Sequence, residues 1–171
     1  MRLVVGSSVT LDSPAMSLDA VWRFLHLFFA FSYVGLLMLS ERNGRAVLAT
    51  NDWGQRALLL QVVQLSTRVA GLGGFIILGV FGNLLAMKSG YRMAADRWLM
   101  VVNTLWIANL VVLMFFTSPH IAQLSRIATA AARGEASEGW AMALGRWRFG
   151  NVVLSFLYVA FLALMVFRWR G

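Results

Sequence analysis

The chain of 171 residues contains no cysteine, only two prolines and few charged residues. Without cysteine, the sequence excludes disulfides, zinc–thiolate sites, iron–sulfur clusters and thiol nucleophiles. Charged residues make up 13% of the chain and hydrophobic residues 60%, whereas a soluble domain carries roughly 25% charged residues. A chain with so little charge cannot cover a water-exposed surface, so we expect an integral membrane protein.

Acidic residues are also scarce, with 7 against 15 basic residues and a formal net charge of +8. A strongly basic chain is one mark of nucleic-acid binding. Here, however, the basic residues flank long apolar runs, which is where membrane proteins carry their anchors and topology signals. We therefore expect the partner to be a lipid bilayer and not a nucleic acid.

Four apolar runs are each about 20 residues long, which is the length of helix that crosses the hydrocarbon core. They predict an all-α integral membrane four-helix bundle, formed by a single domain over residues 18–171. Residues 1–17 form a polar tail that lacks the apolar core of a signal peptide. Four spans place both termini on one side of the membrane, named side A here, and the opposite helix ends on side B. The helices are expected at about 18–40, 52–87, 97–117 and 137–168.

A shorter amphipathic helix is predicted at about 119–133, between helices three and four. Ser118 would cap this helix, Pro119 would occupy its first turn and Gly134 would end it. We expect it to lie along the side B interface. Basic residues are divided almost evenly between the two sides, so the positive-inside rule does not set the orientation.

Polar residues within membrane spans are costly and usually face the bundle interior. With about 1.5 Å of rise per residue, His26 and Asn103 both lie about 9 Å from side A, and Met100 and Met165 lie at about 4–5 Å. His120 is more than about 30 Å away on side B. The sequence thus offers a haem b site at His26, with Asn103, Met100 or Met165 as the neighbouring group. The alternative is that His26 only bonds to Asn103, Asn83 or a backbone carbonyl of another helix and ties the bundle together.

Two further groups of residues in the predicted spans are candidates for ligand contact or for helix packing. Arg68, Gln64 and Asn151 are candidates for contact with a quinone headgroup or an anion near side B, although Arg68 can instead snorkel to the lipid headgroups. Five glycines of helix two allow close helix packing, or form a smooth face for a flat ligand; they are at positions 71, 73, 74, 79 and 82. Tryptophans at the predicted helix ends, Trp147 among them, are typical of an interfacial aromatic belt.

The run Arg23-Phe24-Leu25-His26, followed by Tyr33-Val34-Gly35, resembles the first helix of a family of small four-helix bacterial membrane proteins of unknown function. This family is distantly similar to the copper-resistance D-type proteins and to the HemJ-type protoporphyrinogen oxidases. The resemblance covers about residues 18–168 and implies a multi-pass protein of the bacterial inner (plasma) membrane. In the HemJ-type branch it implies that His26 binds haem b, together with a lysine of the third helix. This chain has no lysine in that helix.

The sequence contains no paired membrane carboxylates, no nucleophile beside a base and no metal-ligand cluster. We therefore expect a non-catalytic membrane subunit or accessory protein, within a respiratory or photosynthetic redox assembly. Its partners would be other membrane subunits or a second copy of the chain. The alternatives are a haem-b-associated or quinone-associated redox protein that uses His26, and a small copper or solute transport module.

Overall fold

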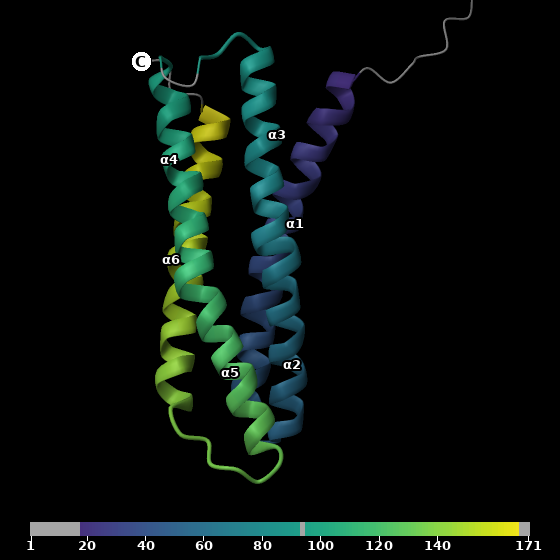
Figure 1. The fold of residues 1–171 in the computed structure, drawn as a ribbon, viewed down its shortest axis with the longest axis vertical. Helices are drawn as coiled ribbons and strands as arrows, with labels where there is room; N and C mark the ends of the chain where they lie inside the picture. The colour runs from purple at the N-terminus through teal and green to yellow at the C-terminus, as the bar shows by residue number, and fades with distance from the viewer. Residues whose placement is uncertain (1–17, 93–94, 168–171) are drawn as a thin grey trace, which may run out of the picture.

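The computed structural model describes residues 18–92 and 95–167, and within these ranges every regular element is helical. The predicted tail over 1–17 lies outside the described residues. Four long helical rods form an up-and-down bundle (Figure 1), so the predicted all-α four-helix fold is confirmed. The first rod is α1 (Leu18–Ala49) and the fourth is α6 (Trp140–Phe167). The second and third rods are each made of three segments: α2 (Trp53–Ser66), η1 (Thr67–Gly73) and α3 (Gly74–Lys88), then α4 (Arg97–Val111), η2 (Val112–Thr117) and α5 (Ser118–Ala131).

All four rods are long and apolar enough to cross a membrane, which makes the chain a multi-pass membrane protein. The first described residue of α1 and the last of α6 lie at the same end of the bundle, which is side A (Figure 1). The second rod contains 36 residues and is about 54 Å long at 1.5 Å per residue. Because the hydrocarbon core is about 30 Å thick, the rods are longer than a simple crossing needs.

The first rod continues to Ala49, beyond the predicted end at about residue 40. The added turns have an inner face, on which Val47 is fully buried. On the same face Gly44 allows close contact with the fourth rod, because a Cβ there would lie 3.2 Å from the ring of Trp147. On the outer face Arg45 pairs with Glu41 at 2.8 Å. Tertiary packing therefore extends the helix past the point where the apolar run ends.

The helix predicted at about 119–133 is present, but it does not form a separate helix between the third and fourth rods. This segment is α5, and it continues the third rod without a break. A proline inside an α-helix removes one backbone hydrogen bond and clashes with the carbonyl four residues earlier. The turn before Pro119 is widened into the π-helical segment η2, a local irregularity of the kind that accommodates such a disruption. The helix therefore passes through Pro119, where the sequence suggests a new start.

The buried side chains form two clusters along the bundle. The cluster toward side A contains Tyr33, Phe75 and Tyr158, and the hydroxyl of Tyr158 donates to the Ala30 carbonyl at 2.8 Å. The cluster toward side B joins α2, α5 and the side B parts of α1 and α6 around Trp147. Trp147 is only 1% exposed, so its prediction as an interfacial belt residue is wrong.

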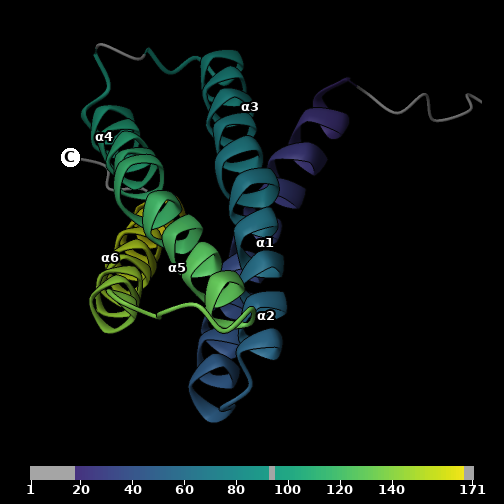
Figure 2. The same ribbon diagram turned by 60° about the horizontal axis from the view of Figure 1, so that its bottom comes forward.

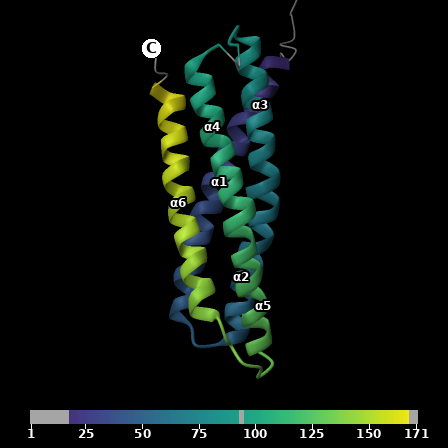
Figure 3. The same cartoon turned by 60° about the vertical axis from the view of Figure 1, so that its left-hand side comes forward.

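The rods are closer together at side B than at side A. Figures 1 and 2 show α1, α3 and α4 diverging toward side A, and Figure 3 shows α4 between α6 and α3. At side B, Arg56 fixes the short connection between the first two rods by donating to the carbonyls of Val47 and Thr50. Its guanidinium also lies over the rings of Trp53 and Trp140, at 4.4 and 5.5 Å. The bundle is thus held at side B and open to a cavity at side A.

Candidate functional site

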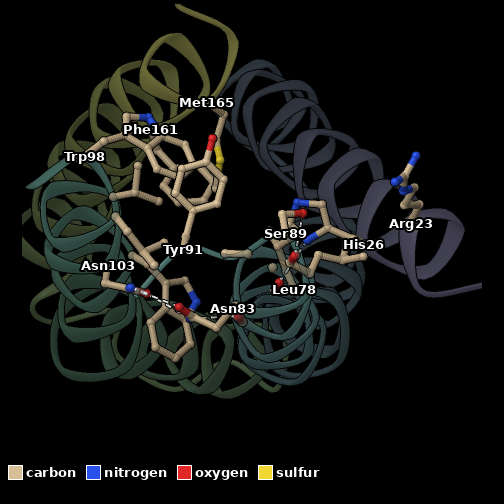
Figure 4. A pocket seen from close by; sticks show the side chains of 17 residues that line it. Arg23, His26, Leu78, Asn83, Ser89, Tyr91, Trp98, Asn103, Phe161 and Met165 are labelled. Atoms are coloured by element: carbon tan, nitrogen blue, oxygen red, sulfur yellow. Dashed lines mark hydrogen bonds between the residues drawn. The ribbon is translucent and has the colours of Figure 1, made fainter. Parts of the chain in front are cut away.

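A cavity of about 400 Å³ lies between α1, α3, α4 and α6 near side A (Figure 4). Its volume is within the range of small-molecule sites, which is about 300–1,000 Å³. Most of its wall is apolar or aromatic, and a few polar groups face it. The lining residues used below are Arg23, His26, Leu78, Gly79, Gly82, Asn83, Trp98, Leu99, Val102, Asn103, Trp106, Phe161 and Met165.

His26 enters the cavity from α1, and its ring is oriented by α3. The Nδ1 atom lies 3.1 Å from the carbonyl oxygen of Leu78. This carbonyl is accessible because the residue one turn later is Gly82, where a Cβ would lie 2.8 Å from Cε1 of His26. A carbonyl can only accept a hydrogen bond, so Nδ1 carries the proton and Nε2 keeps a lone pair. Nε2 has no partner among the described residues, and the ring faces the cavity in Figure 4.

Asn83 of α3 and Asn103 of α4 form a reciprocal amide pair in the cavity wall. Asn83 donates to Oδ1 of Asn103 at 2.9 Å, and Asn103 donates back to Oδ1 of Asn83 at 3.0 Å. The amide nitrogen of Asn83 also donates to the Gly79 carbonyl at 2.9 Å. Both N–H groups of Asn83 are therefore engaged, whereas one N–H of Asn103 has no partner among the described residues.

The amide pair predicts energetic coupling between the second and third rods. We expect Asn83→Ala and Asn103→Ala each to lower the free energy of unfolding, and the double variant to lose less than the sum of the two. The coupling should be about 0.6–1.7 kcal/mol, the range found for hydrogen bonds between membrane helices, because the first substitution already breaks the pair. A double-mutant cycle by denaturant titration measures this quantity. The matched control is the cycle of Asn83 with the exposed Thr104, which should show no coupling.

Tryptophan rings form two walls of the cavity. Trp106 donates to the Phe75 carbonyl at 2.9 Å, and Trp98 donates to the Leu164 carbonyl at 2.8 Å. Because both indole N–H groups are used by the protein, these rings offer only their apolar faces to a ligand. Trp106 also lies so close to α3 that a Cβ at Gly79 would be 2.1 Å from its ring.

The glycines of the second rod mainly allow close packing, which is the first of the two readings from the sequence. At four of the five positions a Cβ would lie within 3.4 Å of a side chain from another helix. Two of those side chains, Trp106 and His26, line the cavity. The positions and the side chains are Gly71 with Leu36 and Leu113, Gly74 with Phe29, Gly79 with Trp106, and Gly82 with His26.

The structure brings His26, Asn103 and Met165 to one cavity, but not Met100. The side chain of Met100 is 50% exposed and does not line the cavity. The residues of α4 that do line it, Trp98, Val102 and Trp106 among them, recur every four positions. At about 100° per residue, Met100 points away from that arc. Its depth in the membrane fits the prediction, but its direction does not.

The predicted contact group of Arg68, Gln64 and Asn151 is not assembled. Arg68 is exposed and Gln64 is half-buried on the second rod, and neither has a hydrogen bond or ion pair to Asn151 in the described part of the chain. The inward-facing line of that rod runs instead through Val63, Thr67 and Gly71, which are all buried. The π-helical segment η1 begins at Thr67, so an uninterrupted 3.6-residue period does not describe this region.

The second histidine is far from the cavity, as expected. His120 lies in α5, which is toward side B (Figure 1), and its ring bonds to the Phe116 carbonyl one turn earlier. The described residues contain no group of three or more His, Asp or Glu side chains that could hold a metal ion. Lys88, at the end of the second rod, places its ammonium 4.1 Å from the ring of Trp22 and does not line the cavity.

The aromatic walls of the cavity are not evident from the sequence. Trp98, Trp106 and Phe161 look like ordinary belt or core residues in an apolar sequence. The available signal was the four-residue spacing of Trp98, Val102 and Trp106, which puts them on the same side of α4 as Asn103. No family model, curated protein or solved structure matches this chain, so the site rests on its own geometry and the family resemblance remains an expectation.

Proposed function

We propose that the protein is an integral membrane subunit or accessory protein of a redox assembly, and that it holds a redox ligand beside His26. The observation that carries this proposal is the orientation of His26. Its Nδ1 atom is bonded to Leu78, and its Nε2 lone pair faces an apolar cavity of about 400 Å³. Backbone bonding at one ring nitrogen is the usual way in which proteins prepare the other for a ligand.

Two ligands fit a lone pair in such a cavity. Haem b would be held by Nε2 of His26, and the Met165 side chain lines the same cavity as a second candidate to hold it. Haem held there would supply one-electron transfer. A hydroquinone would instead donate a hydroxyl hydrogen bond to the same nitrogen. Most of the remaining wall is apolar or aromatic, which suits the flat ring of either ligand.

The exposed surface supports placement within a membrane assembly. Large apolar side chains cover the outer faces of the rods, including Phe24, Phe31, Phe115 and Phe156, which are 64–73% exposed. Such faces suit lipid tails or neighbouring membrane helices. We propose that the bundle spans a bacterial inner membrane, with side A at one face of that membrane. Other subunits would contact the bundle. No described feature favours the copper or solute transport alternative over this function.

The proposal predicts a ligand that co-purifies with the chain and depends on His26. The full chain should be purified from bacterial membranes grown with ample haem supply, and its absorption spectrum and extracted quinones measured. We expect a Soret band or a stoichiometric quinone in the wild type, and a loss of about tenfold or more in occupancy for His26→Ala, because the Nε2 lone pair that faces the cavity is removed.

The matched control is His120→Ala, which changes the histidine at the other end of the bundle and should leave occupancy unchanged. Circular dichroism checks that both variants remain helical. A wild-type protein that carries neither haem nor quinone contradicts the proposal, and so does a ligand that stays fully bound in folded His26→Ala.

A further inference from the structure

We infer that the ligand class of the side A cavity is a neutral para-hydroquinone, bound in its reduced form by His26 and Asn103. This inference rests on the proposed function and narrows it from a redox ligand at His26 to one chemical class. It comes from two hydrogen-bonding groups of the cavity wall that have no partner among the described residues, Nε2 of His26 and one N–H of Asn103.

The first free group is an acceptor. Nδ1 of His26 donates to the Leu78 carbonyl, so Nε2 can accept one hydrogen bond and cannot donate one. A ligand placed against Nε2 must therefore bring a hydrogen, as a hydroxyl group does. The carbonyl oxygen of an oxidised quinone has no hydrogen to give and would face this lone pair unfavourably.

The second free group is a donor. Asn83 uses both N–H groups, on Asn103 and on the Gly79 carbonyl, and Asn103 uses one of its own on Asn83. The remaining N–H of Asn103 can donate to an oxygen. His26 and Asn103 come from α1 and α4, and Figure 4 shows them at different sides of the cavity. A ligand that meets both needs a hydroxyl at one place and an oxygen acceptor at another.

The walls between these two groups suit a flat ring. Trp98, Trp106 and Phe161 line the cavity, and the indole N–H groups are already bonded to backbone carbonyls. Aromatic faces stack on flat rings in offset or edge-on arrangements. A disubstituted aromatic ring with oxygens at its two ends, which is a para-hydroquinone, matches the acceptor, the donor and the walls together.

The charge of the cavity favours this class over haem. Of the 17 residues that line it, all of them in the described ranges, only Arg23 carries a charge at pH 7 with His26 neutral. Haem b brings two carboxylates, and buried charges need paired partners. A hydroquinone is neutral and requires no counter-ion within the bundle.

The test measures binding of decylubiquinone in its oxidised and reduced forms. The full chain is placed in phosphatidylcholine nanodiscs, and binding isotherms are recorded by calorimetry under argon. We expect the reduced form to bind about tenfold more tightly than the oxidised form, since one hydrogen bond of about 1.4 kcal/mol corresponds to that ratio. In His26→Ala this preference should disappear. In Asn103→Ala both forms should bind several-fold more weakly, whereas the exposed neighbour Thr104→Ala should behave as wild type.

A second variant keeps the test valid if His26→Ala does not fold. Gly82→Ala retains the imidazole but places a methyl group 2.8 Å from its Cε1 atom, so it should displace the ring and reduce the preference for the reduced form. Equal binding of the two forms by the wild type overturns the hydroquinone inference. No binding of either form, together with a haem spectrum that requires His26, also overturns it but leaves the proposed function intact. A chain that binds neither quinone nor haem contradicts both.

Discussion

Replacing Trp147 by alanine should lower the free energy of unfolding by about 3–5 kcal/mol, the range for removing a large aromatic side chain from a packed core. Trp147 is 1% exposed and is the largest side chain of the cluster toward side B. It contacts the first rod at Gly44 and belongs to the same cluster as Leu60 of α2 and Leu124 of α5. Its removal therefore opens a cavity between all four rods, and the effect can be measured by denaturant titration in bicelles.

The matched control is Phe156→Ala on the same helix. Phe156 is 73% exposed, so its truncation should cost less than about 1 kcal/mol. Trp147→Phe should have an intermediate effect, because it loses volume but also removes an indole N–H that has no hydrogen-bond partner in the described structure. Equal losses for Trp147→Ala and Phe156→Ala would show that the side B parts of the rods do not form a packed core.

The four membrane-spanning helices could be predicted from the sequence because the thickness of the bilayer sets the length of each apolar run. A span needs about 20 apolar residues, whatever its neighbours are. The ends of the rods could not be predicted in this way, because they are set by tertiary contacts. Residues 41–49 and 118–131 are helical through packing in the cluster around Trp147. Pro119 gives a local signal for a new helix, and the wide turn of η2 overrides it.

The residues of the candidate site could also be predicted only in part from the sequence. Rise per residue predicts depth, and His26, Asn103 and Met165 do line one cavity. Depth alone does not give the direction of a side chain, and Met100, which has the right depth, does not line the cavity. The direction of a side chain inferred from the 3.6-residue helical period is also wrong where the helix type changes, as it does at Arg68 within η1. The protonation of His26 depends on an accessible carbonyl in another helix, and no sequence pattern reports that.

Replacing Gly79 by alanine should lower the free energy of unfolding by about 1–3 kcal/mol, as overpacking does in a filled interior. The added Cβ would lie 2.1 Å from Cε2 of Trp106, well inside contact distance. The indole cannot turn aside without losing its hydrogen bond to the Phe75 carbonyl at 2.9 Å. The third rod must therefore move away from the second, and the wall of the cavity must move with it.

The control and a rescue variant separate this clash from the general effect of changing a helical glycine. Gly35 of α1 has no atom within 4 Å of the position of an added Cβ, so Gly35→Ala should not destabilise the protein and should raise the free energy of unfolding by about 0.5–1 kcal/mol through its higher helix propensity. Combining Gly79→Ala with Trp106→Ala should abolish the added cost of the first substitution, because the methyl group then enters the space left by the indole. If Gly79→Ala is as mild as Gly35→Ala, the second and third rods do not approach each other here. In that case the aromatic wall beside Asn103 is not held in the position that binding a flat ring requires.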